Sequence, residues 1–270
     1  MFYIIENYGW AAGWILGSIF IFLRYAMISG LFFALFYILF RNRFLKRKIQ
    51  RSFPAVRAIK LEIKYSALTT CIFAVVGLII YGMYQLGITA IYLKLSEYGT
   101  GYVVLSVILL IFIHDSWFYW MHRLMHHPKV FTKIHRVHHL SRNPTPWAAL
   151  SFHPLEALIE IGFLPVAVLW IPLHPSTIFI FSIWALLFNV VGHLGFEILP
   201  RGSIRHPLFR WFNTPTHHNL HHQKGSCNYG LYFNFWDTLM NTNHPNYHEI
   251  FDNLHSQNPK PVCSEDSKGR

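Results

Sequence analysis

Long apolar runs alternate with short polar segments along the first two thirds of the chain. Residues 10–40, 66–93 and 101–121 are almost continuously apolar. A bilayer core needs about 20 apolar residues per helix, so we expect each run to form a membrane-spanning helix. The first run is long enough to be tilted or kinked. Arg24 interrupts it, and an arginine at this depth is expected to pack, snorkel or pair with a polar neighbour.

Two shorter apolar runs follow, and they are separated by the proline-containing sequence IPLHPS. These runs cover Ile159–Trp170 and Thr177–Val191. Proline interrupts a helix, so the pattern predicts a helical hairpin that enters the membrane and returns. After Phe196 the chain becomes polar and rich in Asn, Pro and His. We expect the tail, residues 256–270, to be disordered.

The composition is that of a membrane protein. Hydrophobic residues make up 53% of the chain and charged residues 13%, against about 25% charged residues in a soluble domain. The formal net charge is +11, and nine of the 23 Lys and Arg residues lie within residues 41–64. Such a block beside apolar segments indicates a cytoplasmic loop facing anionic lipid, rather than a nucleic-acid-binding face.

The basic block also predicts the topology. With 41–64 in the cytoplasm, the first apolar run enters from outside and the second leaves. The third run returns near Met121, and the hairpin brings the chain back near Phe196. Residues 122–155 and 197–270 are therefore both expected on the cytoplasmic side.

The cysteines and the N-terminus give no indication of a disulfide framework, a thiolate site or a cleaved signal. Cys71, Cys227 and Cys263 are the three cysteines, and no CxxC pair occurs. Neither a disulfide framework nor a thiolate metal site is predicted. The start MFYIIENYGW has no basic segment and no small-residue cleavage site, so we expect it to belong to the mature chain.

Histidines are strongly clustered: 15 of the 18 lie between His114 and His222. The stretch DSWFYWMHRLMH places Asp115, Tyr119, His122 and His126 at offsets of 0, 4, 7 and 11. These offsets share one face of a helix. His122 and His126 can therefore approach one metal ion from successive turns.

Three further histidine groups complete the pattern. HRVHH holds His135, His138 and His139; His193 follows near the end of an apolar run; and THHNLHH repeats the spacing of HRVHH. Neutral imidazole binds Zn, Fe, Cu and Ni, and about ten imidazoles are enough for two ions. The candidate ligands are His122, His126, His135, His138, His139, His193, His217, His218, His221 and His222.

The boxes HRLMH, HRVHH and HHNLHH resemble those of the fatty acid hydroxylase/sterol desaturase superfamily of integral-membrane di-iron enzymes. The segments around them are similar too: DSWFYWMHR, FHPLE (Phe152–Glu156) and NYGLYFNFWDTLMNT (Asn228–Thr242). The closing segment resembles those of bacterial sterol desaturase-like proteins, sterol C5-desaturases and alkylglycerol monooxygenases. The resemblance covers about residues 100–245, and the first 95 residues share only hydropathy.

The resemblance implies ligation of two iron ions by nine of the ten histidines above, with either His217 or His218 as the ligand at that point. Zinc is a substitute expected in recombinant material. It also implies O₂ as co-substrate and hydroxylation or desaturation of a sterol, fatty acyl or ether lipid. A separate cytochrome b5-, ferredoxin- or reductase-type protein would supply electrons. Asp115, Tyr119 and Glu156 are the candidate catalytic residues. His153 is either a ligand or a helix cap, and His114 and His127 stay open.

The fold class expected is all-α: a membrane bundle of about four to five spans or hairpins, with a cytosolic helical cap carrying the histidines. Residues 1–100 would form the N-terminal membrane part, 101–255 the catalytic domain and 256–270 the tail. Two other functions compete. A zinc-dependent hydrolase is disfavoured because no HExxH motif occurs. A metal transporter or metal-binding protein would place ligands within the spans, whereas the boxes lie at and beyond the span ends.

Overall fold

The computed structural model describes residues 2–256, and the predicted disordered tail lies outside them except for Ser256. The prediction of an all-α chain is confirmed, because the described residues contain isolated bridges and no β-strand. The helices are α1 (Phe2–Phe33), α2 (Arg41–Phe44), α3 (Val56–Gln85), α4 (Gly99–Met125), α5 (Pro128–Ile134), α6 (Pro154–Ile161), α7 (Phe163–Trp170), α8 (Pro175–Gly192), α9 (Pro215–Lys224), α10 (Phe235–Leu239) and α11 (Tyr247–Asn253).

Four helical segments of the described chain are long and apolar enough to cross a membrane. They are Tyr3–Leu39, Val56–Gln85, Gly99–Met125 and Pro175–Gly192. The first is α1 extended by a π-helical turn at Ala34–Leu39, and the fourth is the second half of the predicted hairpin. The first half of that hairpin bends at Gly162 into the short helices α6 and α7.

The surfaces of these helices are apolar where a soluble protein would be polar. Contiguous apolar surface of this extent marks a membrane-facing region, and the chain is an integral membrane protein. Exposed large side chains on the spans include Trp10, Ile15, Ile19, Leu23, Met27, Leu31, Val75, Ile79, Val104, Leu105, Phe112 and Phe179.

Both bounds of the second span differ from the sequence prediction. The second span begins at Val56 rather than at residue 66 and ends at Gln85 rather than 93, so the basic segment between the first two spans is shorter than predicted. Lys60 and Lys64 lie on the exposed face of α3, whereas Glu62 is buried and accepts a hydrogen bond from Thr145. A helix continues through charged residues when they occupy one outward face.

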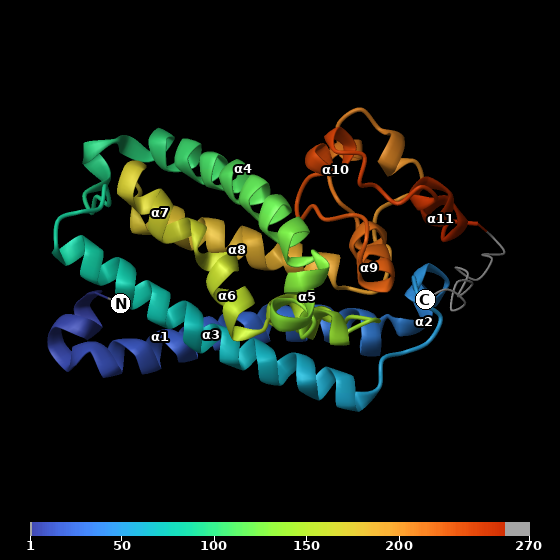
Figure 1. Ribbon diagram of the computed structural model, residues 1–270, viewed down its shortest axis with the longest axis horizontal. Helices are drawn as coiled ribbons and strands as arrows, with labels where there is room; N and C mark the ends of the chain where they lie inside the picture. The colour runs from blue at the N-terminus through green and yellow to red at the C-terminus, as the bar shows by residue number, and fades with distance from the viewer. Residues whose placement is uncertain (1, 257–270) are drawn as a thin grey trace.

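The core joins helices that are distant in the sequence. Val76 of α3, Leu110 of α4, Val168 of α7 and Phe181 of α8 belong to one buried cluster. A second cluster joins α1 to the 3₁₀ turn Pro146–Leu150 and to α8. Figure 1 shows α1 and α3 side by side, with the segments after α8 gathered at one end of the bundle. That end carries the histidines of α9.

Candidate metal centre

The ends of α4 and α8 and the whole of α9 fix the positions of several candidate ligands. His122 lies in the last turn of α4, and His193 follows the last residue of α8. Helix α9 starts at Pro215 after Thr214, whose hydroxyl accepts a hydrogen bond from the His217 backbone N–H at 3.1 Å. It stops at Gly225, which has a φ of 70° that favours glycine. The ten-residue helix therefore holds its histidines in a fixed register.

The structure brings nine histidines into two groups. In each group the ligand atoms all lie within 4.8 Å of one another. The first group consists of His122, His126, His135, His139 and His221; the second group consists of His138, His193, His218 and His222.

The Nε2 atoms converge within each group. In the first group, the His122–His135 and His126–His221 Nε2 pairs are 3.0 Å apart. In the second, Nε2 of His193 lies 3.1 Å from those of His218 and His222, and 3.3 Å from that of His138. Two imidazole nitrogens that bind one ion at about 2.1 Å and at right angles would also be about 3 Å apart.

In five of the nine rings (His122, His135, His138, His193 and His221) the opposite nitrogen, Nδ1, is held by an acceptor. Nδ1 of His122 donates to the Tyr229 carbonyl at 2.8 Å, and Nδ1 of His221 donates to the Cys227 carbonyl at 2.7 Å. Nδ1 of His193 likewise donates to the Asn189 carbonyl at 2.7 Å. A carbonyl accepts only from a protonated nitrogen, so Nε2 of a neutral ring carries the lone pair.

Converging lone pairs repel one another unless a cation lies between them. Burial and the neighbouring histidines lower the pKa values of His138 and His218 well below the usual range. Burial also lowers the pKa of His193 to about 4 and that of His139 to about 3. The rings are thus neutral at physiological pH, which is the form that binds metal. The donor set fits one metal ion in each group.

The two groups lie side by side. His138 and His139 are adjacent in the sequence but belong to different groups, and so are His221 and His222. The rings of His139 and His222 have their centroids 4.9 Å apart, and those of His135 and His138 5.2 Å apart. The boxes HRVHH and HHNLHH therefore each contribute histidines to both groups, and this keeps the two groups adjacent.

Glu156 contacts the first group. Its Oε1 accepts a hydrogen bond from Nδ1 of His135 at 2.7 Å, and both side chains are buried. Burial raises the pKa of the Glu156 carboxyl, and burial with the nearby histidines lowers the pKa of His135. A dication at Nε2 would favour the ionised carboxylate. This is the carboxylate–histidine arrangement that orients a metal ligand.

His217 lies outside both groups. It is fully buried, with its ring against Tyr247 and its Nε2 3.5 Å from an Asp237 carboxylate oxygen. Of the two adjacent histidines between which the family resemblance left a choice, the structure brings His218 together with the other candidates and does not bring His217.

Asp115 and Tyr119 also lie outside the groups. Oδ1 of Asp115 accepts from the backbone N–H groups of Tyr232 and Phe233, at 2.9 and 3.2 Å. The Tyr119 hydroxyl lies 3.0 Å from Oγ1 of Thr242. Both side chains therefore tie α4 to residues 228–242, and neither contacts a member of the two groups through a hydrogen bond in the described chain.

The histidines left open take other positions. His153 caps α6, with its Nδ1 accepting from the Leu155 backbone N–H at 3.3 Å, and His127 caps α5 in the same way. The Nδ1 atom of His114 lies 2.8 Å from the Tyr232 hydroxyl. The remaining histidines also lie outside both groups: His174, His206, His244, His248 and His255.

The sequence patterns did not predict the acceptors that form hydrogen bonds with the histidine rings. The acceptors at Ser151, Asn189, Tyr229 and Cys227 are backbone carbonyls, which carry no residue signature. Asp237 was missed too: it is fully buried and accepts from the backbone N–H groups of Tyr229 and Gly230. The sequence feature that could have identified Asp237 is its position in the segment NYGLYFNFWDTLMNT.

Comparison with known proteins agrees with this geometry. The fatty acid hydroxylase family model matches residues 107–242, just over half of the chain. A Delta(7)-sterol 5(6)-desaturase of Gibberella zeae is 31% identical over 82% of this chain and 65% of its own length. Human lathosterol oxidase is 28% identical over 73% of this chain and 62% of its own length.

A third relative is the C-4 methylsterol oxidase of Schizosaccharomyces pombe, 32% identical over 55% of this chain and 50% of its own length. The matches thus span between half and two thirds of these curated relatives. No solved structure matches the chain significantly. The matched residues include all nine histidines of the two groups, and the chain belongs to the fatty acid hydroxylase family.

Proposed function

We propose that this protein is a membrane-bound di-iron oxygenase that hydroxylates or desaturates a C–H position of a lipid. The observation that carries the proposal is the convergence of nine buried or partly buried imidazoles in two adjacent groups. Such a donor set suits a pair of redox-active ions. Bound iron would supply the reduction of O₂ that no side chain can perform.

Either outcome balances with two electrons and two protons. Hydroxylation places one oxygen atom of O₂ in the lipid and releases the other as water. Desaturation removes two hydrogens from adjacent carbons and releases both oxygen atoms as water. A cytochrome b5-, ferredoxin- or reductase-type protein would supply the electrons.

The role of the chain is to hold the histidine rings and to orient them toward the metal ions. His122, His193 and His221 are fixed by Nδ1 hydrogen bonds to carbonyls. Glu156 holds His135 through a carboxylate. The nine side chains are fully or partly buried, which limits the access of bulk water to the reacting carbon.

The relatives support a sterol-type substrate. Their names describe oxidation of sterols, as a desaturation in one case and as an oxidase reaction in others. The apolar helices beside the histidine groups support delivery of the lipid from the bilayer. The basic segment after the first span supports a cytoplasmic position for the site.

Metal analysis combined with lipid analysis tests the proposal. Purified protein should hold about two iron ions per chain, and membranes with an electron donor should consume O₂ as the lipid changes mass by one oxygen or two hydrogens. Replacement of His138 or His221 by Ala should abolish turnover while the protein stays in the membrane. Normal turnover in these variants, or metal flux into liposomes without O₂ uptake, would contradict an oxygenase.

A further inference from the structure

An apolar cavity of about 740 Å³ lies between α1, α3, α4, α6, α7 and α8. This volume falls within the range of about 300–1,000 Å³ typical of small-molecule sites. The cavity reaches the histidine groups through Phe118 and Phe152, which line it. The ring centroid of Phe118 lies 4.9 Å from that of His122, and that of Phe152 lies 5.3 Å from that of His138.

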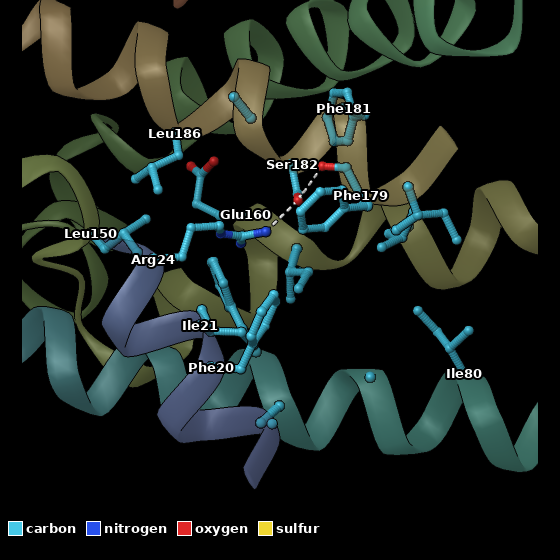
Figure 2. Close-up of a pocket in the computed structure, with 18 of the residues that line it drawn as sticks. Phe20, Ile21, Arg24, Ile80, Leu150, Glu160, Phe179, Phe181, Ser182 and Leu186 are labelled. Carbon is cyan, nitrogen blue, oxygen red and sulfur yellow. Dashed lines mark hydrogen bonds between the residues drawn. The ribbon is translucent and has the colours of Figure 1, made fainter. Parts of the chain in front are cut away.

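A few polar and ionisable side chains line this mostly apolar space. Arg24, Glu160 and Ser182 all belong to its wall, and Figure 2 shows Arg24 and Glu160 extending into the same part of the cavity. Ionisable groups inside a membrane bundle are costly and commonly mark a functional site. Arg24 lies outside the region matched by the family model, so the family pattern does not account for it.

The Arg24 guanidinium has N–H donors that are not used in hydrogen bonds within the described chain. Its Nη1 donates to the Ser182 hydroxyl at 2.5 Å, and that hydroxyl donates onward to the Phe179 carbonyl at 2.7 Å. The buried Nε of Arg24 has no hydrogen-bond partner. A guanidinium carries five N–H donors, so an acceptor is needed at this point of the cavity.

Glu160 offers the complementary group. Among residues 2–256, its carboxyl forms neither a hydrogen bond nor an ion pair with Arg24. A ligand hydroxyl placed between them can accept from the guanidinium and donate to a carboxyl oxygen of Glu160. A hydroxyl offers a donor and an acceptor in one group, whereas a ligand carboxylate offers acceptors only.

We propose that Arg24, Ser182 and Glu160 form a recognition site for the hydroxyl end of a lipid alcohol, whose apolar body fills the cavity toward the histidine groups. The inference rests on the proposed lipid oxygenase function and names the class of its substrate. Ser182 lies eleven residues before His193 in the same helical segment, a rise of about 16 Å. The site therefore holds the polar end away from the reacting carbon.

Equilibrium binding to the full chain in nanodiscs, without an electron donor, tests the site separately from turnover. The probes are tritiated cholesterol and 1-octadecanol, the methyl ether of each, and octadecanoic acid. Wild-type protein should bind at least one alcohol about tenfold or more tightly than its ether. Comparison of the sterol with the chain alcohol identifies which source of hydroxyl the cavity prefers.

Arg24→Met should reduce this preference to about twofold or less, with metal content unchanged. Ser182→Ala and Glu160→Leu should each partly reduce the preference for the alcohol over its ether. These two variants test the site even if Arg24→Met does not fold. The lipid-facing control Leu23→Met should bind as wild type does. Tighter binding of octadecanoic acid than of either alcohol, or full alcohol preference in all three variants, would overturn the proposal. Failure of turnover alone would count only against the oxygenase function.

Discussion

Glu156 Oε1 lies 2.7 Å from Nδ1 of His135, and the Nε2 of the same ring lies 3.0 Å from that of His122. One imidazole thus links a buried carboxylate to the first histidine group. The carboxylate sets the tautomer, orients the ring and makes Nε2 a stronger donor to a metal.

Removal of this carboxylate should weaken metal binding without unfolding the protein. We expect Glu156→Gln to lower the metal affinity of the first group about 10- to 100-fold, because the amide keeps the volume but loses the charge. Competition with a chelator, followed by metal analysis, measures the change. The exposed Glu249→Gln is the matched control, and equal metal retention in both variants would argue against the role of Glu156.

His217 and His218 should respond differently to the same substitution. His218→Ala removes one of four converging nitrogens, so we expect the second group to lose most of its metal. His217→Ala removes a buried ring next to Tyr247, so we expect lower stability with both ions retained. Metal stoichiometry and thermal unfolding of the two variants separate these effects. Loss of metal in His217→Ala alone would reverse the assignment.

Asp115 is expected to act on stability. In Asp115→Ala the backbone N–H groups of Tyr232 and Phe233 lose their acceptor, at a cost of about 2–4 kcal/mol. Asp115→Asn keeps an oxygen at the same place and should be much milder. Thermal unfolding measures both variants. If Asn and Ala lower stability equally, the acceptor role is not the explanation.

Acid should destabilise the metal-free protein. The pKa values of His139 and His193, about 3 and about 4, lie below the ordinary 6.5, so the unfolded chain binds protons that the folded chain does not. Stability therefore falls as the pH falls from about 6.5 toward 4, by about 1.4 kcal/mol per pH unit for each such histidine.

The raised pKa values of buried carboxyls such as Glu156, Glu160 and Glu197 have the opposite sign, but the histidines with lowered pKa values outnumber these carboxyls. Unfolding of chelator-treated protein, followed from about pH 7 to about pH 5, should show the midpoint temperature falling by roughly 5 °C or more. A constant or rising midpoint would contradict the neutral imidazoles. Protein loaded with metal should show a smaller change, since bound ions exclude the protons.

The proposed topology predicts a cytoplasmic C-terminus. A tag placed there should resist protease added outside intact spheroplasts and should be cleaved once the membrane is opened. A second tag in the basic segment 41–55 should behave in the same way, because both lie on the side with the basic residues. Cleavage of the C-terminal tag in intact cells would refute the arrangement.

Local patterns in the sequence determined the spans and the histidine boxes. Hydropathy depends on composition along one segment, so the runs in α1, α3, α4 and α8 could be recognised without any partner. The spacing of His122 and His126 depends only on the 3.6-residue period of one helix. The segment 159–170 was harder, because the bend at Gly162 depends on how α6 and α7 pack.

Only the tertiary structure decided how the histidines divide. On α9, both His217 and His218 have a neighbour at helical spacing, and the register toward the bundle places His218 in the second group and His217 against Tyr247. The division of His138 from His139, and the carbonyls of Tyr229 and Ser151 that hold Nδ1 of His122 and His138, arise from contacts between separate segments of the chain. Such contacts leave no periodic trace in the sequence, because each depends on where two separate backbones meet.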